Sequence, residues 1–416
     1  MSVSPGYLPA IMFTGSREES TEFSEDGTVV KYSVKPRFPY IDCPECGAPL
    51  ISNGNAPVKW VRDLPSGGMQ VVYEVHCKRY RCPNCGKTCS ENLDCIFDGQ
   101  MTKRLKEKLV DRVLLRDTFS KVAADYGVSD QTVRRAFFEW ATKHEWQLRY
   151  ETPRVLGLDE AHIDDHFRLV VTDIEKNLIL DMLPNNKTQT VIKFLKNLPS
   201  KDNVKVVTMD FADGYALAVR RSLPFQPLIV IDRFHVVQLL NRKLDMTRKR
   251  IHREEKARSE GTAKRLKHER TLFMANLEDL DDVGVDKLCE WLKEYPLLEK
   301  AYGLKEQFRM IYNYPERAFA EYAFDDWCAA ITPDLPEFES LRDTFLQRRE
   351  HILNYFDARY TNAYTESANN IIKGVEKQGK GYDFDTLKKI VLFSCRNPRD
   401  PNAKPRTLSF RQDHMQ

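Results

Sequence analysis

Three acidic residues stand where an α/β fold could gather them into one metal site. Asp159 is predicted to close a strand in RVLGLDE, and Asp210 closes another in VVTMD. A carboxylate at the carboxyl end of a strand faces the crevice where α/β sheets bind ligands. Two carboxylates held close together repel each other, and divalent cations relieve that repulsion. The alternative is a purely structural role, because Asp is common at strand ends, where it can cap a helix.

A third carboxylate must come from outside these two strands, and we select Glu366, near the start of the helical segment TESANNIIKGVEKQ. Helical spacing puts Glu366, Asn370, Lys373 and Lys377 on one face, which joins a metal ligand to a phosphate-binding stripe. Two Mg²⁺ or Mn²⁺ ions at such a triad would activate a water or a 3′-hydroxyl and stabilise the leaving oxygen of a phosphodiester. Glu376, farther along the helix, is a poorer candidate.

Two CxxC knuckles of one pattern predict a second metal site, of a structural kind. They are Cys43-Pro-Glu-Cys46-Gly and Cys82-Pro-Asn-Cys85-Gly, and the glycine after each knuckle permits the tight turn that aims backbone amides at sulfur. Four thiolates form a tetrahedral Zn²⁺ site with no open position for catalysis. The alternative is that the cysteines are unligated. Three nearby residues replace a ligand, bind a second ion or are ordinary residues of a small module: His76, Cys77 and Cys89.

The elements that must position these residues follow one another in a clear order. From about residue 154 the signals run β-β-β-α-β-α-β, with strands in RVLGLDE, HFRLVVTD, NLILDML, VKVVTMD and PLIVIDR, and this order is that of a ribonuclease-H-like α/β fold. Beyond Asp232 the chain becomes almost wholly helical. We therefore expect seven regions: an arm (1–40) that looks loosely ordered, a zinc-binding module (41–98), a helix-turn-helix domain (99–150), the first part of the catalytic core (151–235), an all-helical insertion (236–350), the C-terminal helices of the core with the catalytic Glu (351–400) and a tail (401–416).

The segment SKVAADYGVS followed by DQTVRRAFFEW has the form of a helix-turn-helix. Gly127 supplies the turn and Ser129 is a good N-cap for the second helix. The residues left facing outward, near the end that would enter a major groove, are Asp130, Gln131, Arg134 and Arg135. We expect the last three to bind DNA, although similar segments are often plain helical hairpins.

The helical insertion carries a local excess of positive charge. Between Arg242 and Arg270 twelve Lys and Arg stand against five acids. This stretch is either an ordinary solvated helix face or a clamp that neutralises DNA phosphates without reading sequence. In the second interpretation its densest part supplies Arg248, Lys249 and Arg250.

Composition places few further limits. The 416 residues are 42% hydrophobic and 30% charged, with a formal net charge of only +3, so any basic surface must be local. The chain begins without a signal-peptide pattern, and it lacks a run of about 18 apolar residues that could cross a membrane. Seven of the ten cysteines lie between Cys43 and Cys95, which favours metal binding over disulfides. We expect a cytoplasmic, nucleoid-associated protein.

Four strings resemble the ISL-three (ISL3) family of bacterial insertion-sequence transposases: GLDEAH, TMDFADGY, IVIDRFHVVQLLNRKLDMTR and YTESANNIIKGVEKQGKGY. The resemblance runs from about residue 41 to about 395. It implies a DDE transposase in which Asp159, Asp210 and Glu366 bind the metal ions, and which recognises the terminal inverted repeats of its own element. Asp232 and His235 resemble the DxxH element of several DDE families, so His235 either approaches the metal site or merely packs at a helix start.

The sequence therefore predicts a transposase that nicks and joins double-stranded DNA at paired element ends, as a homodimer. The alternative is a catalytically silent, transposase-derived DNA-binding regulator. A nuclease without strand transfer is a third possibility, against which the two amino-terminal DNA-binding modules argue.

Overall fold

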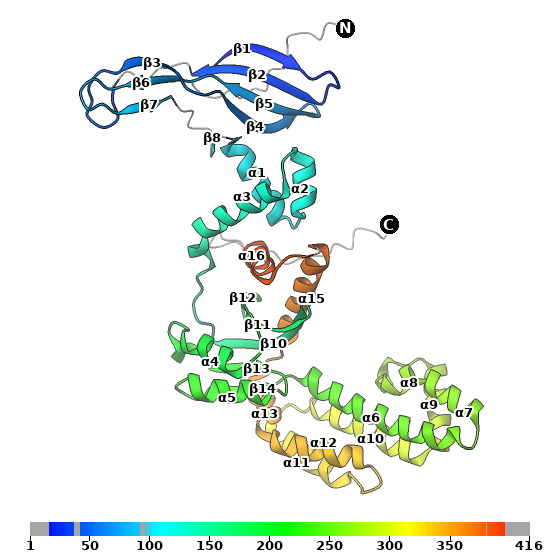
Figure 1. Ribbon diagram of the computed structural model, residues 1–416. Coiled ribbons are helices and arrows are strands. Elements are labelled where there is room, and N and C mark those ends of the chain that lie inside the picture. The colour runs from blue at the N-terminus through cyan, green and yellow to red at the C-terminus, as the bar shows by residue number, and fades with distance from the viewer. Residues whose placement is uncertain (1–15, 37–41, 92–95, 98–99, 380, 396–416) are drawn as a thin grey trace. The chain divides into compact units, whose positions relative to one another are not determined.

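A computed structural model describes residues 16–36, 42–91, 96–97, 100–379 and 381–395. The chain forms two compact units, Met1–Leu148 with Lys377–Ser394, and Arg149–Glu376 with Cys395–Gln416 (Figure 1). The predicted tail and the first 15 residues of the predicted arm lie outside the described residues. Within the described ranges, no helix combines the length and the apolar composition needed to cross a membrane.

The first unit begins with a six-stranded sheet in the order β1-β2-β5-β4-β9-β8. Its strands are β1 (Ser16–Phe23), β2 (Val29–Pro36), β4 (Lys59–Ser66), β5 (Met69–Val75), β8 (Ile96–Phe97) and β9 (Met101–Thr102). The expectation of a loosely ordered arm is wrong for residues 16–36. In β2 the alternate residues Val30, Tyr32 and Val34 are buried, and β2 pairs in parallel with β5. The period of two is a strand signal that was visible in VVKYSVKP.

A three-stranded sheet, β3-β6-β7, adjoins the cysteine knuckles. It consists of β3 (Ile51–Asn55), β6 (Lys78–Arg81) and β7 (Thr88–Ser90). The predicted helix-turn-helix follows as α1 (Lys103–Leu114), α2 (Phe119–Tyr126) and α3 (Asp130–Lys143), then the short η1 (Glu145–Leu148). Gly127 ends α2 in the left-handed region at φ 62°, and the Ser129 side chain accepts from Thr132 N, so the predicted turn and N-cap are confirmed.

The last helix, α16 (Phe384–Cys395), belongs to this first unit rather than to the second. The rings of Trp140 in α3 and Phe393 in α16 lie edge to face at 5.0 Å, and Lys389 Nζ lies 3.0 Å from Glu145 Oε1. The sequence pattern had placed this segment in the catalytic core. The difference arises because α3 offers a half-buried Trp140 that the apolar face of α16 covers.

The second unit is built on a five-stranded sheet in the order β12-β11-β10-β13-β14. The strands are β10 (Val155–Ile163), β11 (His166–Asp173), β12 (Leu178–Leu183), β13 (Val206–Met209) and β14 (Leu228–Ile231), and the helices α4 (Thr188–Lys196) and α5 (Asp213–Ser222), with the one-turn η2 (Lys201–Asn203), connect the last of them. The predicted order β-β-β-α-β-α-β is confirmed. The first three strands form an antiparallel meander, and β10, β13 and β14 run parallel.

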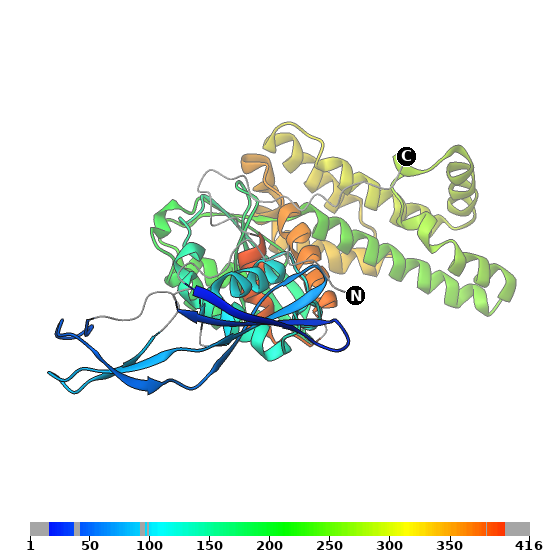
Figure 2. The ribbon, with the colours of Figure 1, turned by 90° about the horizontal axis from the view of Figure 1, so that it is seen from above.

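A helical insertion follows β14, as predicted. It comprises α6 (Arg233–Lys256), α7 (Glu260–His268), α8 (Arg270–Met274), η3 (Leu277–Asp279), α9 (Asp282–Glu294), α10 (Pro296–Ile311), α11 (Arg317–Ala330), α12 (Pro336–Gln347), α13 (Arg349–Leu353) and α14 (Tyr355–Ala358). The long α6 runs alongside α10 and α12 (Figures 1 and 2). Aromatic side chains fill the core between these helices, among them Phe308, Phe324, Trp327 and Phe345. Most of these large side chains therefore form the hydrophobic core of the insertion.

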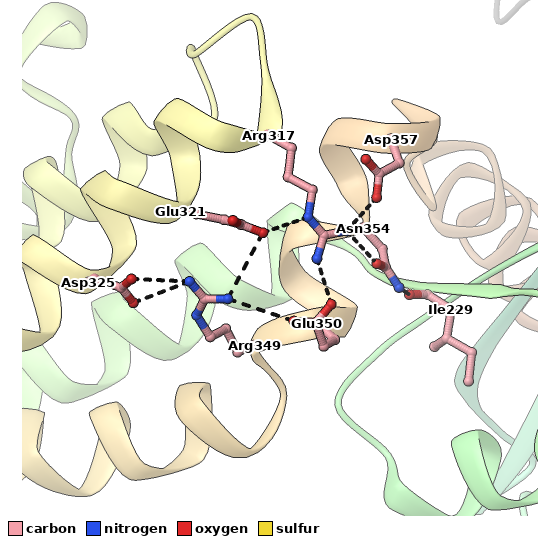
Figure 3. Close-up of polar contacts among 8 residues, drawn as sticks. All are labelled: Ile229, Arg317, Glu321, Asp325, Arg349, Glu350, Asn354 and Asp357. Carbon is pink, nitrogen blue, oxygen red and sulfur yellow. Dashed lines mark hydrogen bonds and ion pairs between the residues drawn. The ribbon is translucent and has the colours of Figure 1, made fainter.

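The insertion returns to the sheet through a polar junction (Figure 3). The buried Asn354 donates from Nδ2 to the backbone oxygen of Ile229 in β14 at 2.9 Å, and Arg317 in α11 donates to Asn354 Oδ1 at 3.1 Å. Arg317 also reaches carboxylates of α11, α13 and α14, namely Glu321, Glu350 and Asp357. The chain then enters α15 (Ala363–Gln378), which carries Glu366.

Candidate active site and metal centres

Asp159 lies within β10 rather than at its end. The strand continues to Ile163 because residues Leu156–Ile163 pair with the antiparallel β11, which corrects the predicted strand end. On the other side, β13 pairs only with Val155–Gly157, so Asp159 stands just beyond the parallel ladder. Its side chain is buried at 5% exposure, and Asp159 Oδ1 accepts from the backbone N of Glu160 at 2.9 Å.

Asp210 and Asp232 follow directly after two neighbouring parallel strands. Asp210 comes after β13 and accepts from the backbone N of Ala212 at 2.9 Å. Asp232 comes after β14, is 2% exposed and begins α6. The carboxyl ends of parallel strands meet at one edge of a sheet, so the prediction that Asp210 closes a strand is confirmed, and Asp232 has an equivalent place.

Two first-turn helix residues complete the cluster. Glu366 is in the first turn of α15 and His235 in that of α6. His235 Nε2 lies 3.7 Å from Asp159 Oδ1 and 3.9 Å from Glu366 Oε1. Ligand atoms of Asp232, His235 and Glu366 lie within 4.8 Å of one another. Asp232 and His235, which rank second to the triad on sequence grounds, thus form a group with Glu366, whereas Asp159 and Asp210 both stand outside this group.

The pKa values of the acids show how tightly the carboxylates are gathered. Burial, together with the charges of Asp210 and Asp232, raises the pKa of Asp159 to about 6. Burial, the Asp232 charge and that of Asp159 raise the pKa of Glu366 to about 7. The pKa of Asp210 is also raised, by burial and by the Glu160 charge. A cluster that holds its protons this firmly is short of positive charge.

The donor set fits a divalent cation. His235 Nε2 and Glu366 Oε1 are buried and have no hydrogen-bond partner among the described residues. Buried polar atoms are rarely left in this state, and an ion is one of the explanations for them. Carboxylate oxygens are the ligands that Mg²⁺ and Mn²⁺ prefer, and an imidazole nitrogen suits transition metals.

Two asparagines that the sequence pattern did not single out hold the cluster together. Asn369 donates from Nδ2 to Asp159 Oδ2 at 2.8 Å, and Asn362 donates its backbone N–H to Asp232 Oδ1 at 3.1 Å. Helical spacing alone pointed to the next residue, Asn370, which is exposed. The available signal was the run of polar residues in TNAYTESANN, at positions of α15 that face the sheet.

Of the other predicted site residues on helices, some are exposed to solvent and some make contacts within the protein. Lys373 and Lys377 are exposed on α15. Glu376, the poorer candidate for the third acid, accepts the backbone N–H of Asp164 at 2.5 Å and so holds a turn. On the helix-turn-helix, Gln131 and Arg135 are exposed, whereas Arg134 donates from Nη2 to Asp383 Oδ2 at 2.6 Å.

The predicted basic clamp is mostly engaged in internal pairs. Arg248 is 3% exposed; it donates to Asp245 Oδ1 at 2.7 Å and to the backbone oxygen of Leu266 at 3.2 Å, so it is a packing residue and not a phosphate ligand. Arg250 pairs with Glu337 at 3.0 Å. The side chain of Lys249 is 61% exposed, although its Nζ lies 2.8 Å from Asp245 Oδ2. The count of charges did not show that Asp245 of the same helix and Glu337 of α12 would pair with these cations.

The four knuckle cysteines come together as predicted. Their sulfurs lie within 4.8 Å of one another, with Sγ–Sγ distances of 3.7 Å for Cys43 and Cys85 and 3.5 Å for Cys46 and Cys82. The glycine after each knuckle has a positive φ, 70° at Gly47 and 73° at Gly86, as the tight turn requires. The backbone N–H of Cys85 lowers the pKa of the Cys82 thiol. This geometry suits Zn²⁺.

The three nearby residues that might have replaced a ligand stand apart from the four-sulfur group. Cys77 is buried in the core of the six-stranded sheet, and His76 pairs with Glu74 at 3.6 Å. Cys89 is partly buried in β7. Within the described ranges, none of the three joins the cysteine cluster.

Comparison with known proteins gives a consistent result. Residues 156–391 match a family model described as a transposase, and residues 99–141 match the helix-turn-helix domain of transposase family ISL3. The chain is 25% identical over 378 residues to the transposase for insertion sequence element IS1001 of Bordetella parapertussis, covering 88% of this chain and 91% of that protein. It is also 25% identical over 397 residues to the transposase for insertion sequence element IS1557 of Mycobacterium tuberculosis, covering 88% of each.

Proposed function

Because this chain belongs to the ISL3 family of transposases, we propose that it binds the terminal inverted repeats of an insertion sequence and then cuts and joins DNA at the acidic cluster. In this proposal the second unit has a ribonuclease-H-like fold, which its strand order β12-β11-β10-β13-β14 supports. Asp159, Asp210 and Glu366 are the DDE residues, and Asp232 and His235 join them.

The convergence of the acids is the observation that carries the proposal. Carboxylates on or directly after three strands and on one helix meet at one edge of the sheet, and burial and mutual repulsion raise the pKa values of three of them. A fold retains such an arrangement at a cost in stability, and such perturbed clusters concentrate at functional sites. Two divalent ions, when bound, would supply activation of the attacking oxygen and stabilisation of the leaving oxygen.

The chain's own residues would set the geometry of attack. Asp159 and Asp232 are buried and held by amide donors, so their oxygens keep fixed directions. In the first reaction the oxygen of water attacks a phosphorus of the DNA, the bond to the 3′-oxygen breaks, and that oxygen takes a proton. In the second, the new 3′-hydroxyl attacks a phosphorus of target DNA, forms the new ester and gives up its proton as the target's own 3′-oxygen leaves. His235, whose Nε2 lies within 4 Å of two carboxylates, would join these acids as a metal ligand.

The first unit would supply binding to the element's ends. Gln131 and Arg135 are exposed on α3, the second helix of the helix-turn-helix, where such a helix meets base edges in the major groove. Structural Zn²⁺ would hold the knuckles of the neighbouring module. Joining two ends requires their synapsis, so we propose a homodimer on paired ends, acting in the cytoplasm on nucleoid DNA.

The test is cleavage of a DNA duplex bearing the element's own end, with Mg²⁺ or Mn²⁺. Asp210→Asn removes one acid of nearly identical shape, and Asp202→Asn is a control that removes an exposed charge from η2, away from the site. We expect wild type and Asp202→Asn to cut, and Asp210→Asn to bind the duplex equally well without cutting. Tight binding with no cutting by the wild type would contradict the proposal and favour the DNA-binding regulator.

A further inference from the structure

Asn362 is a fully buried residue at the entrance to α15 whose polar atoms are all directed at the acidic edge of the sheet. Its Nδ2 donates to the backbone oxygen of Leu158 at 3.3 Å, and its backbone N–H donates to Asp232 Oδ1 at 3.1 Å. Its Oδ1 accepts from Thr208 Oγ1 at 2.9 Å and from Thr365 Oγ1 at 2.8 Å. Its backbone oxygen accepts the N–H of Glu366 at 3.1 Å.

These contacts reach each element that carries an acid of the cluster. They fall on Leu158 beside Asp159, on Thr208 two residues before Asp210, on Asp232 itself, and on both Thr365 and Glu366. The acids themselves come from positions up to 207 residues apart, 366 less 159. The Asn362 side chain therefore links β10 and β13 to the start of α15, and the backbone N–H of the same residue adds Asp232 at the end of β14.

The chemistry of this position is specific to a carboxamide. The two threonine hydroxyls need one oxygen that accepts twice, and the carbonyl of Leu158 needs an N–H donor. Aspartate would supply the acceptor but not the donor, and it would add a charge beside four acids. An apolar residue would remove the partner of the Thr208 hydroxyl and of the Leu158 carbonyl and leave Thr365 with Thr172 alone, which is costly in a low-dielectric interior.

The network continues on the far side of Thr365. The Thr365 hydroxyl also lies 2.7 Å from the hydroxyl of Thr172 in β11, and both threonines are 0% exposed. The sheet leaves room for this contact because residue 157 of β10 is a glycine. The start of α15 is thus fixed to four strands: β10, β11, β13 and the end of β14.

We propose that Asn362 is a positioning residue that holds the acids of the cluster at the separation a divalent cation requires, an inference that rests on the proposed function. It acts through its neighbours and touches neither the DNA nor the reacting atoms. Some residues orient metal ligands by hydrogen bonds without binding the metal themselves. Their removal typically lowers metal affinity or activity by about 10- to 100-fold.

The experiment compares Asn362→Ala with Asn354→Ala in the full-length protein. Asn354 is a matched control, because it is also a buried asparagine that donates to a backbone oxygen of the same sheet, but its side-chain hydrogen bonds among the described residues go to Ile229 and Arg317 and not to the acids. Mn²⁺ affinity is measured by the electron paramagnetic resonance of free Mn²⁺, beside duplex affinity and cleavage rate. We expect Asn362→Ala to bind Mn²⁺ and to cleave about 10- to 100-fold less well, with unchanged duplex affinity. Asn354→Ala is expected to retain the wild-type Mn²⁺ affinity even though its melting temperature falls.

A second pair of variants decides the question if Asn362→Ala does not fold. Thr365→Val keeps the shape but removes the hydroxyl, and Thr365→Ser keeps the hydroxyl. We expect weakened Mn²⁺ binding in the first and rescue in the second. Wild-type Mn²⁺ affinity in folded Asn362→Ala, or in Thr365→Val where the first variant does not fold, would overturn the positioning role and leave the proposed function standing. Failure of the wild type itself to bind Mn²⁺ would instead contradict the proposed function.

Discussion

Gly157 of β10 lies so close to Thr365 of α15 that a Cβ on the glycine would stand 2.5 Å from the threonine Oγ1. The same Cβ would collide with Thr172 Oγ1 and with Ile174 Cδ1. Neither threonine can turn away without breaking the hydrogen bonds that fix the start of α15. The glycine is therefore required by the distance between helix and sheet, not by an unusual backbone angle.

Replacing this glycine is expected to separate α15 from the sheet. Gly157→Ala should lower the free energy of unfolding by about 1–3 kcal/mol, the usual cost of overpacking a core, and should slow cleavage because Glu366 moves with the helix. Gly374→Ala is the control, because a Cβ at that position of α15 would meet no described atom within 4 Å beyond the helix's own backbone. That change should stabilise the protein by about 0.5–1 kcal/mol, because alanine favours helix. Urea denaturation in EDTA measures both. Equal stability of Gly157→Ala and wild type would show that the helix does not approach the sheet this closely.

The cysteine cluster predicts one Zn²⁺ per chain in the amino-terminal module. Cys82→Ser removes a thiolate and should abolish zinc retention, because three thiolates and a hydroxyl hold the ion far less tightly. Structural zinc contributes on the order of 10 kcal/mol to folding, so chelation should expose the amides of β3, β6 and β7 to hydrogen exchange. Cys89→Ser is the control and should retain zinc. Metal content by mass spectrometry checks both variants, and loss of zinc from Cys89→Ser would assign that residue to the site.

The raised carboxyl pKa values predict how the metal-free protein responds to pH. Burial raises the pKa of Asp159 to about 6 and that of Glu366 to about 7, whereas the pKa of both types of carboxyl is near 4 in an unfolded chain. Between pH 4 and 7 the folded state therefore binds more protons than the unfolded state, and these two groups make stability fall as pH rises through that window. Glu366→Gln removes one of them. In EDTA it should be more stable than wild type by roughly 1–2 kcal/mol at pH 7.5 and about equal at pH 5.

Metal binding should make the wild type more stable than Glu366→Gln. At pH 7.5 added Mg²⁺ should raise the melting temperature of the wild type, because a ligand that binds only the folded state stabilises it. The same addition should have little effect on Glu366→Gln. A variant that is destabilised at pH 7.5 in EDTA would show instead that Glu366 makes favourable contacts in the metal-free protein.

The positions of the acids along the fold could be predicted from the sequence, but not which of them would meet. Hydrophobic runs such as VKVVTM mark buried strands, so Asp210 and Asp232 at their ends were visible from local pattern. The closeness of His235 to Glu366 depends on how α6 and α15 pack, and no local period reports the packing of two segments 131 residues apart, 366 less 235. For the same reason the pattern led to the exposed Asn370, while the buried Asn362 and Asn369 make the contacts.

Charge counts were the least informative guide. The run near Arg248 was strongly basic by count, yet Asp245 accepts from two of its members and Glu337 of α12 from a third. A linear sum counts Asp245, which lies on α6 itself, without showing which cations it pairs with, and it cannot contain Glu337, which comes from another helix on folding. The α16 helix could not be placed from the sequence for the same reason. Its apolar residues predict that the helix is packed against other elements, but they do not show which unit those elements belong to.

Arg248 and Lys249 stand side by side in α6 and should respond in opposite ways to truncation. Arg248→Ala removes a buried cation that donates to Asp245 and to the Leu266 carbonyl, and Asp245 keeps Lys249 and Arg270, so unfolding experiments should show a loss of about 1–3 kcal/mol. Lys249→Ala removes a 61% exposed cation and should change stability by less than about 1 kcal/mol. If α6 neutralises phosphates, Lys249→Ala should also weaken binding to any duplex sequence and reduce the slope of log affinity against log salt by about 1. If Lys249→Ala keeps the wild-type salt slope, this face of α6 is exposed to solvent and does not bind phosphate. The predicted loss of stability in Arg248→Ala is independent of that result, because the Arg248 guanidinium is enclosed between Asp245 and the backbone of α7.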